Sequence, residues 1–221
     1  MGGGTILAAA GSAGFIFSRT PTKALEPWAG ATTYTDPIQL ALVHALLAPN
    51  PHNRQPWLVD LTKEGQVTIY HDATRDLPMT DPFNRQIFIG MGCFLETLKI
   101  SATETGHSVD FDILPQGEKG PIAVAKFSKS VTLDQLAQFI TTRHCGKEAY
   151  SDRNIEKDKI SELSNHVTII ADQQHVDALR QITWDALKIE MLTPSTHKRK
   201  RGFDAHRQKG NQCKPRRHRN T

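Results

Sequence analysis

The stretch APNPHNRQPW, from Ala48 to Trp57, decides the fold because it joins a predicted helix to a predicted strand. Its three prolines stiffen the turn, and Asn50, Asn53 and Gln55 place side-chain amides on it. Such a loop can present fixed donors and acceptors to a planar heteroaromatic ligand. The alternative is that the Asn side chains cap local backbone groups while Trp57 packs in the core. On the residues alone, the frequency of Asn in turns favours this alternative.

Helices and strands alternate on both sides of this loop. Asp36 and Pro37 are typical of a helix start, because the first supplies a capping acceptor and the second needs no amide hydrogen. Apolar periodicity predicts the remaining elements: a hairpin of strands 57–62 and 66–71, a helix from 80 to about 106, strands 107–114 and 122–127, a helix at 132–143 capped by Thr132, a short helix at 159–163, a strand at 166–171 and a helix at 173–192 capped by Asp172. This mixture predicts an α+β fold of layered helices and sheet.

A second motif, TTRHCGKEAY, runs from Thr141 to Tyr150 at the end of a predicted helix. It carries Arg143, His144 and Lys147 close to a turn. A guanidinium and an ammonium four residues apart can neutralise a phosphate dianion. The alternative interpretation is a solvated basic turn with no ligand.

The loop at residues 48–57 resembles the P-S-x-x-N-x-Q-P-W loop of the nitroreductase family, whose members are built around FMN. Asn53, Gln55, Pro56 and Trp57 match that pattern, whereas Asn50 stands where Ser is usual. The resemblance implies that Asn50, Asn53 and Gln55 contact the flavin or its substrate.

The basic motif resembles the R-[RH]-S-x-[RK]-x-[FY] segment with which the family holds the FMN phosphate. Arg143, His144 and Lys147 match it, while Cys145 replaces the usual Ser and removes a hydroxyl donor. The resemblance assigns these three basic residues to the phosphate of FMN.

The order of the two motifs is reversed relative to an ordinary nitroreductase. It is similar to an exported subgroup in which two fused nitroreductase-like halves form an intramolecular pseudo-dimer. This resemblance implies a first half at residues 29–140 and the start of a second, incomplete half at 141–196. The segment GATTYTD, residues 30–36, lacks a phosphate motif, so at most one of the two possible flavin sites is equipped.

The resemblance implies an oxidoreductase in which FMN takes reducing equivalents from NAD(P)H and passes them to a nitroaromatic or quinone-like acceptor. No side chain is an obvious catalytic acid or base, so the catalytic residues are left open. The alternatives are a flavin-binding or flavin-sequestering protein without catalysis, or an inactive fragment truncated at both ends.

Residues 1–28 contain the apolar, uncharged run GGGTILAAAGSAGFIF. It is too short for a stable membrane span and fits the hydrophobic region of an export signal without its charged start. The alternative is a flexible Gly/Ala-rich extension. The first interpretation predicts a periplasmic or exported full-length relative. A cytoplasmic location stays open for this chain, because the twin-arginine or Lys-rich start is missing.

Residues 197–221 form a basic tail with ten Lys or Arg and one acidic residue. The formal net charge of +4 therefore combines +9 from this tail with −5 from the rest of the chain. Clustered cations can bind nucleic acid nonspecifically, but the acidic body does not predict a specific nucleic-acid partner. With suitably chosen synonymous codons, a back-translation read one base later after Lys198 can give ESVDLMRIGKREINANPDGIET, which is balanced in charge. We therefore interpret the tail as frameshifted and disordered.

The three cysteines, Cys93, Cys145 and Cys213, are far apart and form no C-x-x-C pair, so neither a disulfide framework nor a metal site is predicted. Cys93 lies in an apolar helix and is expected in the core. Gly90 and Gly92 in the same helix permit a close approach of another helix or of a ligand, and helix–helix packing is the favoured interpretation.

Overall fold

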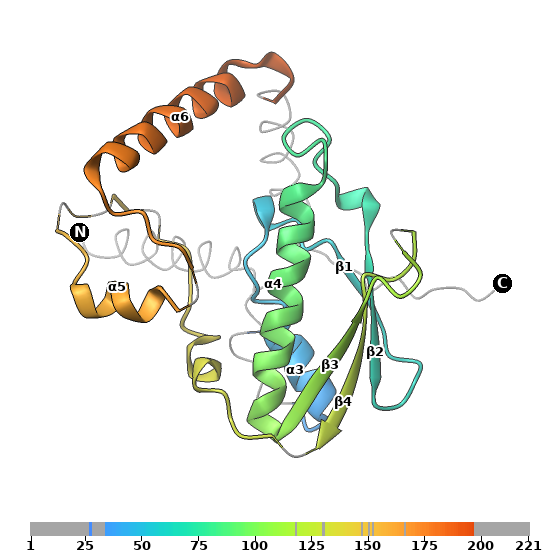
Figure 1. The fold of residues 1–221 in the computed structure, drawn as a ribbon. Helices are drawn as coiled ribbons and strands as arrows, with labels where there is room; N and C mark the ends of the chain where they lie inside the picture. Colours follow the sequence, from blue (N-terminus) through green and yellow to red (C-terminus); the bar gives the residue numbers. More distant parts are fainter. Residues whose placement is uncertain are drawn as a thin grey trace, which may run out of the picture. The chain divides into compact units, whose positions relative to one another are not determined.

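The computed structural model describes residues 27, 34–117, 119–129, 131–146, 148, 149, 151, 153–165 and 167–196 (Figure 1). The predictions for the amino-terminal run, Lys147 and the basic tail lie outside these residues. Contacts within the chain define two compact units, and the boundary between them falls between Arg143 and His144. The predicted halves at residues 29–140 and 141–196 stay predictions.

The first unit contains a four-stranded antiparallel sheet with the order β1-β2-β4-β3. Its strands are β1 (Trp57–Asp60), β2 (Gln66–His71), β3 (His107–Ile113) and β4 (Ala123–Lys129). The predicted hairpin of β1 and β2 is present, and its register pairs Trp57 with His71. The α+β class is therefore confirmed, with helices and an antiparallel sheet in one unit.

The core of the first unit lies between the sheet and two helices, α3 (Pro37–Ala45) and α4 (Arg85–Ala102). The Trp57 ring stacks on Phe94 of α4 with 4.6 Å between ring centroids. The buried residues of this core come from both helices, all four strands and two positions beside them, Ala48 and Ile122. They are Ala41, Leu42, Ala45, Ala48, Trp57, Val67, Ile69, Met91, Phe94, Leu95, Leu98, Ala102, Val109, Ile122, Ala123 and Ala125. Cys93, which was expected in the core, is only half-buried and packs against the edge of it.

A buried polar contact also joins the two helices. His44 of α3 places Nδ1 2.9 Å from the Ser101 hydroxyl and 2.8 Å from a Glu104 carboxylate oxygen. His44 is only 6 % exposed, so this contact satisfies a polar ring that would otherwise be buried without a partner.

The predicted start of α3 is correct, whereas that of α4 is not. Asp36 Oδ1 accepts hydrogen bonds from the amides of Ile38 and Gln39 at 2.8 and 2.9 Å, which confirms the predicted start of α3. The predicted start of the second helix at Thr80–Pro82 is wrong, because α4 begins at Arg85. Asp81 still contributes there, since its Oδ2 accepts from the Ile87 amide at 2.9 Å.

Two further predictions require correction. Residues 132–143 form only a 3-10 turn, η5 (Gln135–Phe139), which Asp134 rather than Thr132 caps. Ala137 and Ile140 bury themselves against Leu47, so tertiary packing uses a single turn of this segment. The predicted strand at 166–171 is absent from its described part, residues 167–171. The other short 3-10 turns are η2 (Pro51–Asn53), η3 (Ala73–Arg75) and η4 (Thr103–Thr105).

The second unit contains α5 (Lys157–Leu163) and α6 (Gln173–Leu192), both close to their predicted bounds. Asp172 caps α6, as predicted, by accepting from the His175 amide at 3.0 Å. Hydrogen bonds from the amide and the ring of His175 hold the pKa of Asp172 below its ordinary value. Of the helices in the described ranges, none is both long and apolar enough to cross a bilayer.

Candidate functional site

The loop between α3 and β1 has an unusual backbone. His52, Asn53 and Gln55 adopt left-handed conformations with φ of 50°, 51° and 48°. Residues other than glycine are disfavoured there by roughly 1–2 kcal/mol each, Asn least of all. Three such residues within four positions persist only if surrounding contacts hold the loop in place.

Asn50 closes this loop from within. Its Oδ1 accepts a hydrogen bond from the Gln55 amide at 2.8 Å, and its Nδ2 donates to the Ala48 carbonyl at 3.1 Å. Both ends of the Asn50 side chain are therefore engaged with local backbone groups. For Asn50 this is the capping role that the residues alone favoured.

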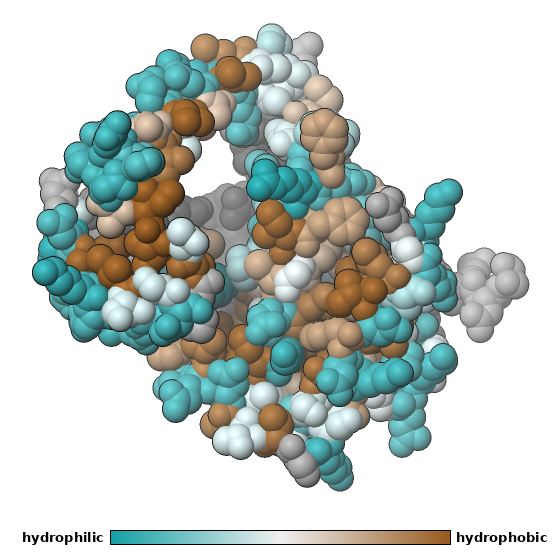
Figure 2. Space-filling model, viewed as in Figure 1, coloured by the Kyte–Doolittle hydropathy of each residue, from teal (hydrophilic) through white to brown (hydrophobic). Residues whose placement is uncertain are grey.

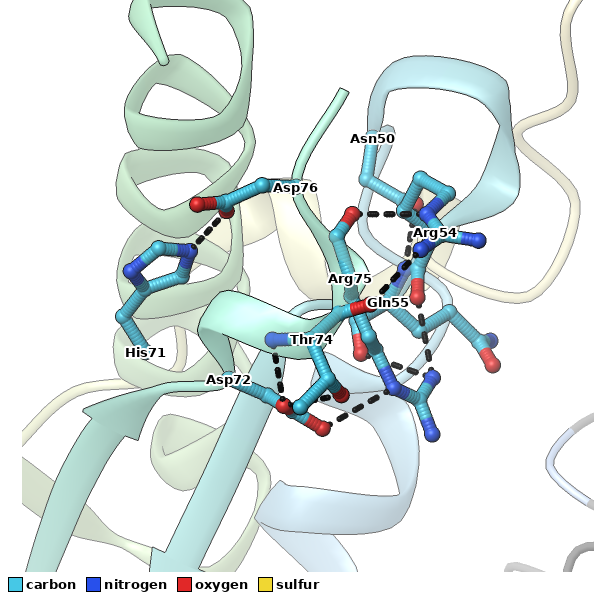
Figure 3. A network of polar contacts seen from close by, with 8 residues as sticks. All are labelled: Asn50, Arg54, Gln55, His71, Asp72, Thr74, Arg75 and Asp76. Atoms are coloured by element: carbon cyan, nitrogen blue, oxygen red, sulfur yellow. Dashed lines mark hydrogen bonds and ion pairs between the residues drawn. The ribbon is translucent and has the colours of Figure 1, made fainter. Parts of the chain in front are cut away.

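Asn53 and Gln55 behave differently from Asn50. Asn53 is exposed and Gln55 half-buried, and neither side-chain amide makes a hydrogen bond to the described part of the chain. The Gln55 amide extends away from the surrounding contacts in Figure 3. These two side chains therefore keep their donors and acceptors available to a ligand.

A pair of arginines ties the loop to the 3-10 turn after β2 (Figure 3). Arg54 donates from Nε to the Arg75 carbonyl at 2.6 Å and from Nη2 to the Thr74 carbonyl at 3.2 Å. Arg75 donates from Nη1 to the carbonyls of Arg54 and Gln55 at 2.9 and 3.0 Å. Each arginine thus holds the backbone of the other's segment.

Asp72 anchors this arginine pair. Its Oδ2 lies 3.3 Å from Arg75 Nε, and its Oδ1 accepts from the Thr74 amide at 3.0 Å. Burial alone raises the pKa of Asp72, but the Thr74 hydrogen bonds and the charge of Arg75 outweigh it and hold that pKa below its ordinary value. The carboxylate is therefore stabilised in its charged form, which the pair with Arg75 needs.

The loop rests directly on α4 at Gly90. A β-carbon at Gly90 would come within 2.9 Å of Pro51 Cδ and 3.2 Å of Asn50 Cβ. At Gly92 a β-carbon would meet no atom within 4 Å. A close approach is therefore present at Gly90, but the favoured interpretation of helix–helix packing is wrong there, because the approaching segment is the loop. At Gly92 nothing in the described chain approaches closely.

A histidine and a carboxylate lie beside the same loop. His71 Nε2 is 2.6 Å from Asp76 Oδ1, and Asn84 donates to the other carboxylate oxygen of Asp76 at 3.0 Å. The Phe88 ring of α4 lies 5.5 Å from the His71 ring. His71 also pairs with Trp57 in the sheet, so this group borders the loop at its strand end.

Sequence reasoning missed Arg54, His71, Asp72, Arg75 and Asp76 as parts of this region. A usable signal was present, because HDATRD, residues 71–76, places a capping Asp, a second acid and an Arg at the end of a strand. The hydrogen-bond partners of the arginines are backbone carbonyls, however, and sequence patterns do not reveal such contacts.

The structure places the predicted phosphate-binding residues only in part. Arg143 belongs to the first unit, where its Nη2 donates to the carbonyl of Leu47, which follows α3 and directly precedes the loop. His144 begins the second unit, and Lys147 lies outside the described residues. Arg143 thus contacts Leu47, the residue directly before the loop. The described residues contain no group of His, Cys, Asp and Glu suited to a metal ion.

Comparison with known proteins gives relatives but no matching family model. The chain is 28% identical over 142 residues to "Probable NAD(P)H nitroreductase PigM" of Serratia sp. (strain ATCC 39006), which covers 59% of this chain and 39% of that protein. It is 28% identical over 110 residues to "Putative NAD(P)H nitroreductase acg" of Mycobacterium tuberculosis (strain ATCC 25618 / H37Rv), covering 50% and 31%. The matched region thus spans well under half of each relative. These similarities, together with the α+β fold, support the assignment of this chain to the nitroreductase family.

Proposed function

We propose that the loop at residues 48–57 is part of the FMN site of an NAD(P)H-dependent oxidoreductase. The observation that carries this proposal is the pair of amides at Asn53 and Gln55, which are held on a fixed backbone with no partner in the described chain. The names of the two relatives support an NAD(P)H-dependent oxidoreductase.

The chemistry of these residues fits a flavin. The pyrimidine edge of an isoalloxazine ring alternates hydrogen-bond donors and acceptors, and a carboxamide offers one of each kind of group. Arg143 has five guanidinium N–H groups, so its hydrogen bond to the Leu47 carbonyl leaves several for a phosphate. His144 and Lys147 complete the phosphate contacts in this proposal.

When bound, FMN would supply the redox chemistry for transfer of reducing equivalents from NAD(P)H to a nitroaromatic or quinone-like acceptor. The contribution of this chain is to orient the ring through Asn53 and Gln55 and to balance the phosphate charge through Arg143. In the proposed full-length relative, the second half of the pseudo-dimer provides the remaining walls of the site.

A second candidate is a protein that binds flavin without turning it over. The Leu47 carbonyl already takes one of the five N–H groups of Arg143, so the remaining groups can hold a phosphate less firmly than an unengaged arginine would, which favours loose binding. In that case the chain binds FMN loosely, so the purified protein is colourless or faintly yellow, and NAD(P)H is not oxidised.

The test is a fluorescence titration of FMN into the full chain and into the double variant Asn53→Ala/Gln55→Ala. We expect the double variant to bind FMN about 5- to 100-fold more weakly, since each of the two lost hydrogen bonds contributes about 0.5–1.5 kcal/mol. Gln39→Ala is the matched control, because Gln39 is an exposed amide on α3. Equal affinity of the double variant and the wild type would contradict the proposal. NAD(P)H oxidation by the FMN-loaded chain separates the enzyme from the binder.

A further inference from the structure

We propose that Arg75 is a positioning residue that fixes the loop so that Asn53 and Gln55 face the flavin, an inference that rests on the function proposed above. The hydrogen bonds of Arg75 in the described chain go to loop carbonyls and its ion pair goes to Asp72, so we assign it a role that acts through the loop. Its place in η3 follows from the sheet, where β2 ends beside the start of β1.

Arg75 holds the Gln55 peptide from one side while Asn50 holds it from the other. The Gln55 carbonyl accepts from Arg75 at 3.0 Å, and the Gln55 amide donates to Asn50 at 2.8 Å. Both hydrogen-bonding groups of one left-handed residue are thereby fixed. The direction of the Gln55 side chain follows from that fixed backbone.

The guanidinium of Arg75 is itself fixed. Its Nη1 reaches the carbonyls of Arg54 and Gln55, while its Nε pairs with Asp72. The Asp72 amide in turn donates to the Pro56 carbonyl at 2.7 Å, so η3 and the loop are joined at a second point. The reciprocal hydrogen bonds from Arg54 complete the connection.

An arginine suits this position better than a lysine. The planar guanidinium presents several donors in fixed directions, so one side chain can serve two carbonyls and a carboxylate at once. An ammonium on a flexible stem keeps the charge opposite Asp72 but not these directions. Arg75→Lys should therefore keep the fold and lose much of the positioning.

The first measurement is amide hydrogen exchange at Gln55 in the flavin-free full chain, for the wild type, Arg75→Ala and Arg75→Lys. We expect exchange at least about tenfold faster in Arg75→Ala and an intermediate rate in Arg75→Lys, because the loop opens locally. Arg85→Ala is the control, since Arg85 is exposed at the start of α4. If Arg75→Ala does not fold, the comparison of Arg75→Lys with the wild type tests the proposal.

The second measurement is FMN affinity, with Gln55→Ala and the double variants included. We expect Arg75→Ala to weaken binding about tenfold in the wild-type background and to have much less effect once Gln55 is Ala. A purely structural role would weaken binding equally in both backgrounds, because independent effects add.

The outcomes separate the two proposals. Unchanged Gln55 exchange in both Arg75 variants, or additive losses of affinity, would overturn the positioning role while the flavin function stands. A wild-type chain that binds no FMN overturns the proposed function and the positioning role together. Faster exchange with a non-additive loss of affinity supports both.

Discussion

Two helices of similar length, α4 with 18 residues and α6 with 20, differ completely in burial. Eight residues of α4 are buried against α3 and the sheet, whereas α6 has no buried residue in the described structure. Both sequences show apolar residues at helical spacing. The comparison teaches that periodicity predicts a helix and its apolar face, but not whether the structure supplies a partner for that face.

The difference is visible in individual side chains. Phe94 and Leu98 of α4 are fully buried, while Ile182, Ile189 and Leu192 of α6 are 64 %, 70 % and 79 % exposed. Figure 2 shows apolar surface along the course that α6 takes in Figure 1. The packed helix should therefore contribute strongly to stability and the exposed helix weakly.

The largest effect is expected in the packed helix. Phe94→Ala should lower the free energy of unfolding by about 3–5 kcal/mol, because it leaves a cavity beneath the Trp57 ring. Urea unfolding followed by circular dichroism measures the loss. Ile89→Ala on the same helix is the control, since Ile89 is 57 % exposed and should change stability by less than about 0.5 kcal/mol. A loss of stability below about 1 kcal/mol in Phe94→Ala would be too small for a core mutation and would mean that α4 is not packed as described.

The second effect concerns the contact between α4 and the candidate site. Gly90→Ala should destabilise by about 1 kcal/mol net, since overpacking against the rigid Pro51 ring outweighs the gain in helix propensity. Gly92→Ala should instead stabilise by up to about 1 kcal/mol, because its β-carbon meets nothing. Thermal unfolding of both variants checks this difference. Equal stabilisation by both would show that the loop does not rest on Gly90.

Much of the first unit could be predicted from the sequence because local signals and packing agree there. Asp36 caps its helix, the hairpin has the expected strands, and Trp57 is in the core. The prediction of a helix at 132–143 failed because the short 3-10 turn η5 is enough to bury Ala137 and Ile140. Tertiary packing, rather than helix propensity, determines the structure of this segment, because helix propensity is a weak constraint.

The candidate site was predictable to a smaller extent. The loop with Asn53 and Gln55 stood out because of its composition and its resemblance to a family motif. The role of Arg54 and Arg75 could not be predicted, because the backbone carbonyls that they hold are 20 or 21 residues away in the sequence. The left-handed backbone at Gln55 could not be predicted either, since that conformation is rare for this residue type.

A small effect is expected on the exposed helix. Ile182→Ala in α6 should change the free energy of unfolding by less than about 0.5 kcal/mol, because little apolar area leaves the interior. Urea unfolding, followed by a spectroscopic probe in the second unit, measures this change in the free energy of unfolding. A loss above about 1 kcal/mol would break the comparison with α4, since a surface substitution does not have that effect.

The smallest effect is expected for Asp72, the carboxylate that pairs with Arg75 beside the loop. The pKa of Asp72 is lowered in the folded chain, so the unfolded chain binds its proton at a higher pH than the folded chain does. The stabilisation from Asp72 is therefore complete above the unfolded value of about 3.9 and is lost as the pH falls through the lower folded value. Asp72→Asn should be less stable than the wild type at pH 6, and the gap should close toward pH 2. Unfolding midpoints across this range test it, with Asp112→Asn, an exposed carboxylate on β3, as the control. A gap of constant size would show that the charge of Asp72 does not support Arg75, and that the loop is held by the arginine hydrogen bonds alone.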